Sequence, residues 1–282
     1  GATIIVGEII KSGAYGLAQA LLVVLVVWYF AFWASRKLFK VDDEMSTMIA
    51  SSVSICGVSA AIATCGTIRG NQKKLSYVIS LVMVVAIPML YIMPLLCDWI
   101  LPMIFPNNEL AAQQVAGAWL GGTIDTTAAV AASGALLGEV AGDTAVIVKA
   151  SQNVLLGLAA FAISLFWSVR DTGNVMETKG SVIWHRFPKF VLGMVIASAV
   201  FSLWFNGGVE IDGNMVKYKA IAKNFQGMFF SIAFVCIGLE TRFKEIFNKE
   251  NRASLKAFLT AQTFKIIFTF IVAVVIFGFI AN

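Results

Sequence analysis

Small and hydroxyl-bearing side chains crowd residues 51–66, inside a long apolar stretch of the sequence. Gly57 lies near the middle of this run, where a glycine could break a helix. A half-helix beginning near Val58 would then direct free N–H groups and a partial positive charge into the membrane, which suits an anion. The alternative is close helix packing through small residues, without a ligand. The candidate substrate-binding residues of this run are Ser54, Cys56, Gly57 and Ser59.

A second run, residues 121–134, has the same character with a carboxylate added. Gly121 and Gly122 form a pair at which a helix could unwind, and Asp125 follows them. A carboxylate at membrane depth is costly unless it is paired or binds a cation, so we expect Asp125 to bind H⁺ or Na⁺ as a coupling ion or to join an ion pair. The alternative role is the N-cap of a half-helix. The candidate substrate-binding residues here are Gly122, Thr123, Asp125, Thr126 and Thr127.

Two lysines also lie inside apolar stretches. Lys149 is followed by Gln152 on roughly the same helix face, and both are candidate substrate-binding residues. Lys149 either reaches back to the membrane interface or faces the cavity, where it would pair with Asp125 or contact an anionic substrate. Lys265 lies near the middle of the last apolar stretch, too deep for its side chain to reach the membrane interface easily, and is a secondary candidate for the site.

The elements that must position these residues are membrane helices. The 282 residues are 59% hydrophobic and only 13% charged, whereas soluble domains have about 25% charged residues. We expect a single transmembrane domain over residues 1–282, all α-helical, with the second and fourth segments interrupted. The predicted segments are 14–35, 45–68, 75–101, 110–138, 144–169, 187–205, 222–239 and 255–281.

Lysine and arginine residues between the segments predict the orientation. If each segment crosses once, the more basic side holds the loops around 36–40, 170–189 and 242–256, and it should be cytoplasmic. The basic residues around 69–74 and 217–223 would then face outward.

Other classes of function lack support in the sequence. The four cysteines form no CxxC pair, and His185 is the single histidine, so we expect no metal site. No HExxH, GxSxG, P-loop or GxGxxG motif is present, and we expect neither an enzyme nor a bound cofactor. The formal net charge of +5 is explained by basic loops between spans, so a nucleic-acid partner is not expected.

The Ser-Ile-Cys-Gly motif at 54–57, the glycine-flanked run 121–134 and the position of Lys149 resemble the YeiH-like bacterial inner-membrane proteins, usually labelled sulfate exporters. The similarity runs over the whole chain. It implies a multi-pass protein of the bacterial inner membrane, with two or three further spans before residue 1.

That family is similar to a wider group of bile-acid and sodium–proton transporters. The likeness implies two inverted repeats whose broken helices cross at the site. It makes the second segment one crossing helix, residues 237–241 its symmetry partner, and the fourth segment a further lining element.

The sequence also departs from the family's pattern. Many members have a His-Glu pair and a later Gln where this chain has Asp125, Thr126 and Ala129, and an Arg where it has Gln152. The resemblance therefore carries over the scaffold but not the sulfate substrate.

Together these observations predict a secondary transporter. It would move a small anionic solute of sulfate, sulfonate or carboxylate type by alternating access, with H⁺ or Na⁺ coupling through Asp125. An ion channel, or a membrane sensor or assembly subunit, is the alternative. The expected partners are the lipid bilayer and the solute, and a homodimer stays open.

Overall fold

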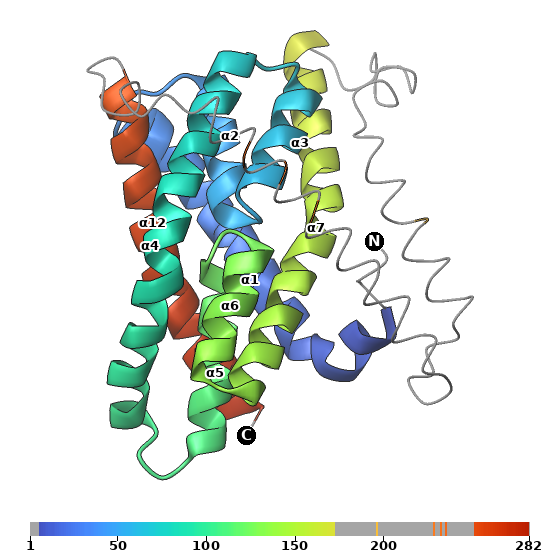
Figure 1. Ribbon diagram of the computed structural model, residues 1–282. Helices are drawn as coiled ribbons and strands as arrows, with labels where there is room; N and C mark the ends of the chain where they lie inside the picture. Colours follow the sequence, from blue (N-terminus) through green and yellow to red (C-terminus); the bar gives the residue numbers. More distant parts are fainter. Residues whose placement is uncertain are drawn as a thin grey trace.

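The computed structural model describes residues 6–172 and 251–281, with a few isolated positions between them (Figure 1). Within these two ranges every regular element is a helix, which confirms an all-α membrane protein. The predicted segments 187–205 and 222–239 lie outside the described residues, as does the predicted partner at 237–241.

Four long helices form the frame of the bundle: α1 (Val6–Lys37), α4 (Gln72–Ile104), α7 (Glu139–Thr172) and α12 (Arg252–Ala273). The last continues as a π-helix (Val274–Ile280). Each contains an apolar stretch long enough to cross a membrane. They expose large apolar side chains, as lipid-facing helices do, among them Leu25, Leu95 and Leu158.

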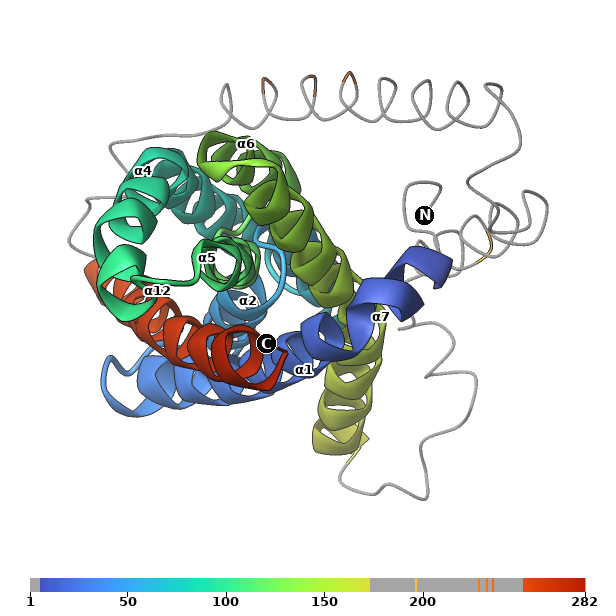
Figure 2. The ribbon, with the colours of Figure 1, turned by 90° about the horizontal axis from the view of Figure 1, so that it is seen from below.

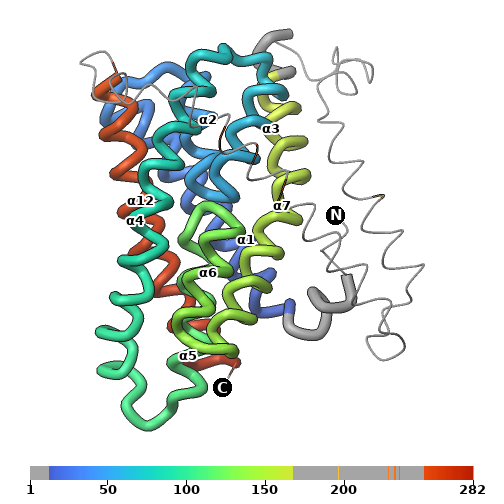
Figure 3. The backbone as a smooth tube through the Cα atoms, in the orientation of Figure 1, coloured from blue at the N-terminus to red at the C-terminus, as the bar shows by residue number. Residues whose placement is uncertain are grey.

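The second predicted segment is a helical hairpin and does not cross the bundle. Helix α2 (Asp43–Ser54) descends to a break at residues 55–57, and α3 (Val58–Ile68) returns to the same end (Figure 3). The returning end lies beside the start of α2, because the Asn71 N–H donates to the Glu44 carboxylate. The predicted break at Gly57 is therefore confirmed, but the chain reverses there.

Side-chain contacts fix the start of α2. Asp42 is its N-cap and accepts a hydrogen bond from the Met45 N–H at 3.1 Å. Lys74, at the start of α4, places its Nζ 2.7 Å from carboxylate oxygens of both Asp42 and Glu44. Partial burial opposes ionisation of Asp42, but the hydrogen bonds from Lys74 and Met45 and the charge of Lys74 outweigh it. The net effect lowers the pKa of Asp42 below its usual value.

A second hairpin enters from the opposite end of the bundle. Helix α5 (Glu109–Thr123) rises to a break at residues 124–126, and α6 (Thr127–Leu137) returns to the end it came from. Gly138, with a φ of 121°, then turns the chain directly into α7. A Cβ on Gly138 would lie 3.3 Å from the side chain of Gln113, in the first turns of α5.

The two hairpins and the helices that follow them are alike and oppositely directed. Helices α2, α3 and α4 have 12, 11 and 33 residues, and α5, α6 and α7 have 15, 11 and 34. At 1.5 Å per residue α2 and α5, the first arms of the two hairpins, are roughly 18 and 22 Å long. Two arms of this length, entering from opposite ends, meet about halfway across a membrane.

Helix α5 occupies the centre of the bundle, surrounded by α1, α4, α6, α7 and α12 (Figure 2). Its glycines allow this, because a Cβ on Gly117 or Gly121 would lie 2.4 Å from a backbone oxygen of α7. A Cβ on Gly122 would lie 2.5 Å from the Thr269 methyl group of α12. The predicted interruption of the fourth segment is therefore confirmed, but it lies at residues 124–126: Gly121 and Gly122 stay helical and permit close packing, and α5 continues to Thr123.

The hairpins also redistribute the basic residues. Reversal at residues 55–57 brings the basic residues of 69–74 to the same end as those of 36–40, which corrects the predicted sides. In the two described ranges only Lys11 lies toward the other end, while Lys149 and Lys265 are buried within the bundle. The basic end holds Arg36, Lys37, Lys40, Arg69, Lys73, Lys74, Arg170, Arg252 and Lys256.

Candidate functional site

The two hairpin tips touch each other in the interior of the bundle. Gly57 has a φ of 61°, in the left-handed region that favours glycine. A Cβ added to it would lie 3.1 Å from the Cβ of Asp125 and 2.7 Å from a methyl group of Val82. The first broken segment therefore meets the fourth segment, which the family resemblance had made only a further lining element.

Asp125 forms a buried ion pair at this meeting point. Its Oδ1 lies 2.7 Å from the Nζ of Lys265 on α12, and both side chains are fully buried. The N-cap of α6 is Thr126, whose hydroxyl accepts a hydrogen bond from the Ala129 N–H at 3.3 Å. The alternative N-cap role for Asp125 is thus wrong, and the expected ion pair exists with Lys265 as the partner.

Helix α7 binds both tips through Lys149 and Gln152. The Lys149 Nζ donates to the Ile55 carbonyl oxygen at 2.8 Å, in the first tip, and to the Gln152 Oε1 at 3.1 Å. The Gln152 Nε2 donates to the Gly122 carbonyl oxygen at 3.1 Å, in the last turn of α5. Lys149 is fully buried, so it does not reach the membrane interface, and its ammonium group lies at the carbonyl end of α2, where a cation is favoured.

The helices that leave the two tips differ in their N-termini. Helix α3 begins after Gly57 and has no side-chain cap, whereas α6 is capped by Thr126. Ser59, in the first turn of α3, is exposed, and Thr126 and Thr127 are partly exposed. The meeting point is therefore accessible along the edge where Ser59, Thr126 and Thr127 lie.

The remaining predicted residues are enclosed. Ser54 is fully buried and its hydroxyl donates to the Ser51 carbonyl oxygen of its own helix at 3.5 Å. Cys56 is buried in the first tip, and Thr123 is buried in the last turn of α5. The structure thus brings the predicted residues of both runs to one place, but only part of them to the accessible edge.

Three further polar residues of the site, Gln19, Gln262 and Thr269, escaped the sequence analysis, which had singled out Lys265 only as a secondary candidate. Gln19 on α1 is fully buried and its Nε2 donates to the Ala118 carbonyl oxygen at 2.7 Å. Gln262, Lys265 and Thr269 form a buried polar stripe on α12. Their spacing of three and four residues in an apolar segment was the available signal, because such spacing places side chains on one helix face.

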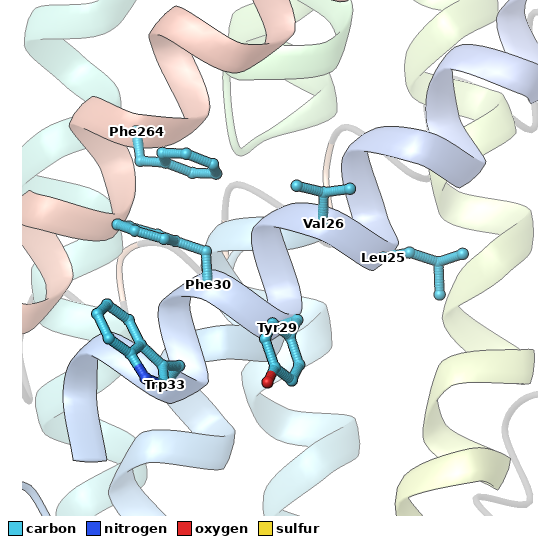
Figure 4. A pocket seen from close by; sticks show the side chains of 6 residues that line it. All are labelled: Leu25, Val26, Tyr29, Phe30, Trp33 and Phe264. Atoms are coloured by element: carbon cyan, nitrogen blue, oxygen red, sulfur yellow. The ribbon is translucent and has the colours of Figure 1, made fainter. Parts of the chain in front are cut away.

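Two hollows lie away from the tips. One, of about 420 Å³, is an apolar groove between α1 and α12, where the rings of Phe30 and Phe264 stack at 3.8 Å between centroids (Figure 4). Its lining residues are Leu25, Val26, Tyr29, Phe30, Trp33 and Phe264. The other, of about 600 Å³, is a polar hollow at the basic end, between the first hairpin and Trp167 of α7. Neither contains a residue of the hairpin tips.

Residues 1–261 match the sequence profile of the family described as Conserved hypothetical protein 698. The chain belongs to this family. Relatives named UPF0324 membrane protein include two from Nitratidesulfovibrio vulgaris, 34% and 35% identical over 98% of this chain and 48% of each relative. Another, from Rhodopirellula baltica, is 35% identical over 98% of this chain and 50% of the relative.

These matches confirm the expected family and its membrane character. The chain spans about half the length of each of these three relatives. No solved structure matches the chain.

Proposed function

We propose that the protein is a secondary transporter that moves a small anionic solute past the two hairpin tips. The observation that carries the proposal is the meeting of two helical hairpins from opposite ends of the bundle beside buried charges. Irregular backbone within a membrane is tolerated where it is enclosed by protein or lines a wet cavity. Broken helices whose ends meet near the midplane are the usual form of a transporter site.

Anion selectivity follows from the charges around the tips. The uncapped N-terminus of α3 offers N–H groups and partial positive charge at the accessible edge. Lys149 and Lys265 contribute two buried ammonium groups against the single carboxylate of Asp125. The local excess of positive charge favours sulfate, sulfonate or carboxylate groups over cations as the transported solute.

Coupling would act through the Asp125–Lys265 pair. A proton on Asp125 weakens the pair and frees the ammonium group of Lys265 to attract the solute. Another charged group near this carboxylate is Lys149 of α7, and Cys56 of the first tip lies close to both Lys149 and Lys265. In this scheme a proton and an anion bind together, which reduces the charge that must cross the membrane.

The arrangement also supports an inverted repeat and an orientation. Elements α2–α4 and α5–α7 would be the two related units. The basic end of the bundle would face the cytoplasm, because cytoplasmic loops are rich in Lys and Arg. The inner membrane is the location that we propose for the multi-pass chain, since the relatives that it matches are bacterial membrane proteins.

Uptake of labelled sulfate, a sulfonate and a carboxylate into proteoliposomes with full-length protein tests the proposal. We expect saturable uptake that depends on external pH, and loss of that pH dependence in Asp125→Asn. Asp98→Asn is the control, since Asp98 is exposed on α4. Normal uptake with unchanged pH dependence in Asp125→Asn would refute the coupling role. Flux that does not saturate with any solute would favour a channel.

A further inference from the structure

Four buried oxygen atoms near the second tip have no hydrogen-bond partner among the described residues. They are Gln19 Oε1, Thr123 Oγ1, Asp125 Oδ2 and Thr269 Oγ1. All four side chains are fully buried. Buried oxygen atoms are rarely left unpaired, because each loses its water without gaining a partner. Four such atoms in one region therefore indicate that something else binds there.

Contacts around Gly122 bring three helices together at this point. A Cβ on Gly122 would lie 2.5 Å from the Thr269 methyl group and 2.8 Å from the Gln19 Nε2. The side chains of Gln19 on α1 and Thr269 on α12 therefore meet over the backbone of α5. Only a glycine at 122 leaves room for both.

Thr123 and Asp125 face the same helix. The Trp119 indole N–H donates to the Ile266 carbonyl oxygen of α12 at 3.0 Å, and Thr123 lies one turn further along α5 on the same face. Asp125 already contacts Lys265 of α12, one turn before Thr269. The four unpaired oxygens thus surround the end of α5 where it faces α1 and α12.

We propose that these oxygens form a sodium site: the amide oxygen of Gln19, the hydroxyls of Thr123 and Thr269, and the second carboxylate oxygen of Asp125. The hydrogen bond from the Gln19 Nε2 to the Ala118 carbonyl oxygen fixes which end of the amide is the oxygen, and an amide oxygen can only accept a hydrogen bond or bind a cation. Amide, hydroxyl and carboxylate oxygens are the ligands that hard cations prefer.

Charge selects a monovalent ion and predicts competition with Lys265. The site has one carboxylate, and the Lys265 ammonium group already neutralises it at 2.7 Å. A divalent ion would add a large uncompensated charge in a low-dielectric interior. Sodium therefore binds as Lys265 withdraws from Asp125, and removal of the lysine charge should strengthen sodium binding. The alternative occupant is water, which would show no preference for sodium.

The inference deepens the proposed function and rests on it for its role in transport, but binding can be measured without transport. The experiment compares the melting temperature of the purified full-length protein in sodium, potassium and choline chloride at equal chloride concentration. We expect sodium alone to raise it, by about 2–4 °C for each kcal/mol of binding free energy. Radioactive sodium retained by the protein gives a second, direct measurement.

Four substitutions test the ligands and the competition. Thr269→Val keeps the shape of the side chain, loses the hydroxyl and should abolish the sodium effect. Thr263→Val is the matched control, because Thr263 is exposed on the same helix and its hydroxyl bonds the Leu259 carbonyl oxygen. Lys265→Met should melt at a lower temperature in choline and gain more from sodium than the wild type does. Thr123→Val replaces Thr269→Val if the latter does not fold.

Each outcome decides the proposal. A sodium-specific shift that is lost in Thr269→Val, kept in Thr263→Val and enlarged in Lys265→Met supports the site. Equal melting in the three salts, or an undiminished shift in Thr269→Val, overturns it and leaves water as the occupant. Sodium binding without solute uptake would refute the proposed function but keep the site. Solute uptake without any sodium binding would refute the sodium site but keep the proposed function.

Discussion

Replacing either partner of the Asp125–Lys265 pair should destabilise the protein strongly. The two groups lie 2.7 Å apart and both are fully buried, so neither can recover its hydration when the other is removed. Loss of one partner of such a pair typically costs about 3–5 kcal/mol, because it leaves an uncompensated buried charge. We therefore expect a cost of this size for Asp125→Asn and for Lys265→Met, measured without sodium.

The double variant separates this reasoning from simple damage to packing. Asp125→Asn combined with Lys265→Met leaves no buried charge at the pair, and replacement of a whole buried pair by neutral residues is often close to neutral. The double variant should thus be more stable than either single variant. The free energy of unfolding, from titration with a denaturing detergent in choline buffer, gives the three values. Additive losses would refute the reasoning, since independent sites add.

Lys74→Met is the control for loss of a lysine. Lys74 also pairs with carboxylates at 2.7 Å, but its side chain is 31% exposed and lies at the basic end. Pairs of this kind contribute about 0–1 kcal/mol. A Lys74→Met cost equal to that of Lys265→Met would show that burial of the pair is not the cause.

Two further predictions concern the first hairpin. Gly57→Ala should lower the unfolding midpoint, because the φ of Gly57 is 61° and the new Cβ would lie 2.7 Å from a Val82 methyl group. Gly66→Ala is the matched control: a Cβ there would have no atom within 4 Å, and the variant should raise the free energy of unfolding by about 0.5–1 kcal/mol. If Gly57→Ala were more stable than Gly66→Ala, the tip geometry would be contradicted. Asp42→Ala should cost about 0.5–2 kcal/mol at neutral pH through loss of the N-cap. Because the pKa of Asp42 is lowered on folding, this contribution is lost as pH falls through the folded-state pKa, and wild-type and variant unfolding curves should converge in acid.

The break in the first hairpin could be predicted from local sequence, but the reversal could not. A glycine among small residues is enough to locate the end of α2 near Gly57. Local sequence does not show whether the chain then continues or returns, because contacts between the two ends of the hairpin, such as the one between Glu44 and Lys74, form only in the fold. Because the reversal was not predicted, the basic residues around 69–74 were assigned to the wrong end of the bundle.

Long-range pairing also explains the other misassignments. The lysine predicted to pair with Asp125 was Lys149, but the pair forms with Lys265, which lies 140 residues away. Gly122 could equally mark unwinding or close approach, and only the positions of Gln19 and Thr269 decide for close approach. Residue type thus predicted which residues matter, whereas their partners required the structure.

The attachment of both tips to α7 limits how this protein could move. A motion that parts the tips from α7 must break the buried hydrogen bonds of Lys149 and Gln152 to the Ile55 and Gly122 carbonyl oxygens. A motion that carries α7 and both tips together as one rigid body breaks none of them. Helix α12 meets this assembly through the buried Asp125–Lys265 pair and the hydrogen bond from Trp119 to the Ile266 carbonyl oxygen, so sliding of the assembly past α12 would have to break both of these contacts.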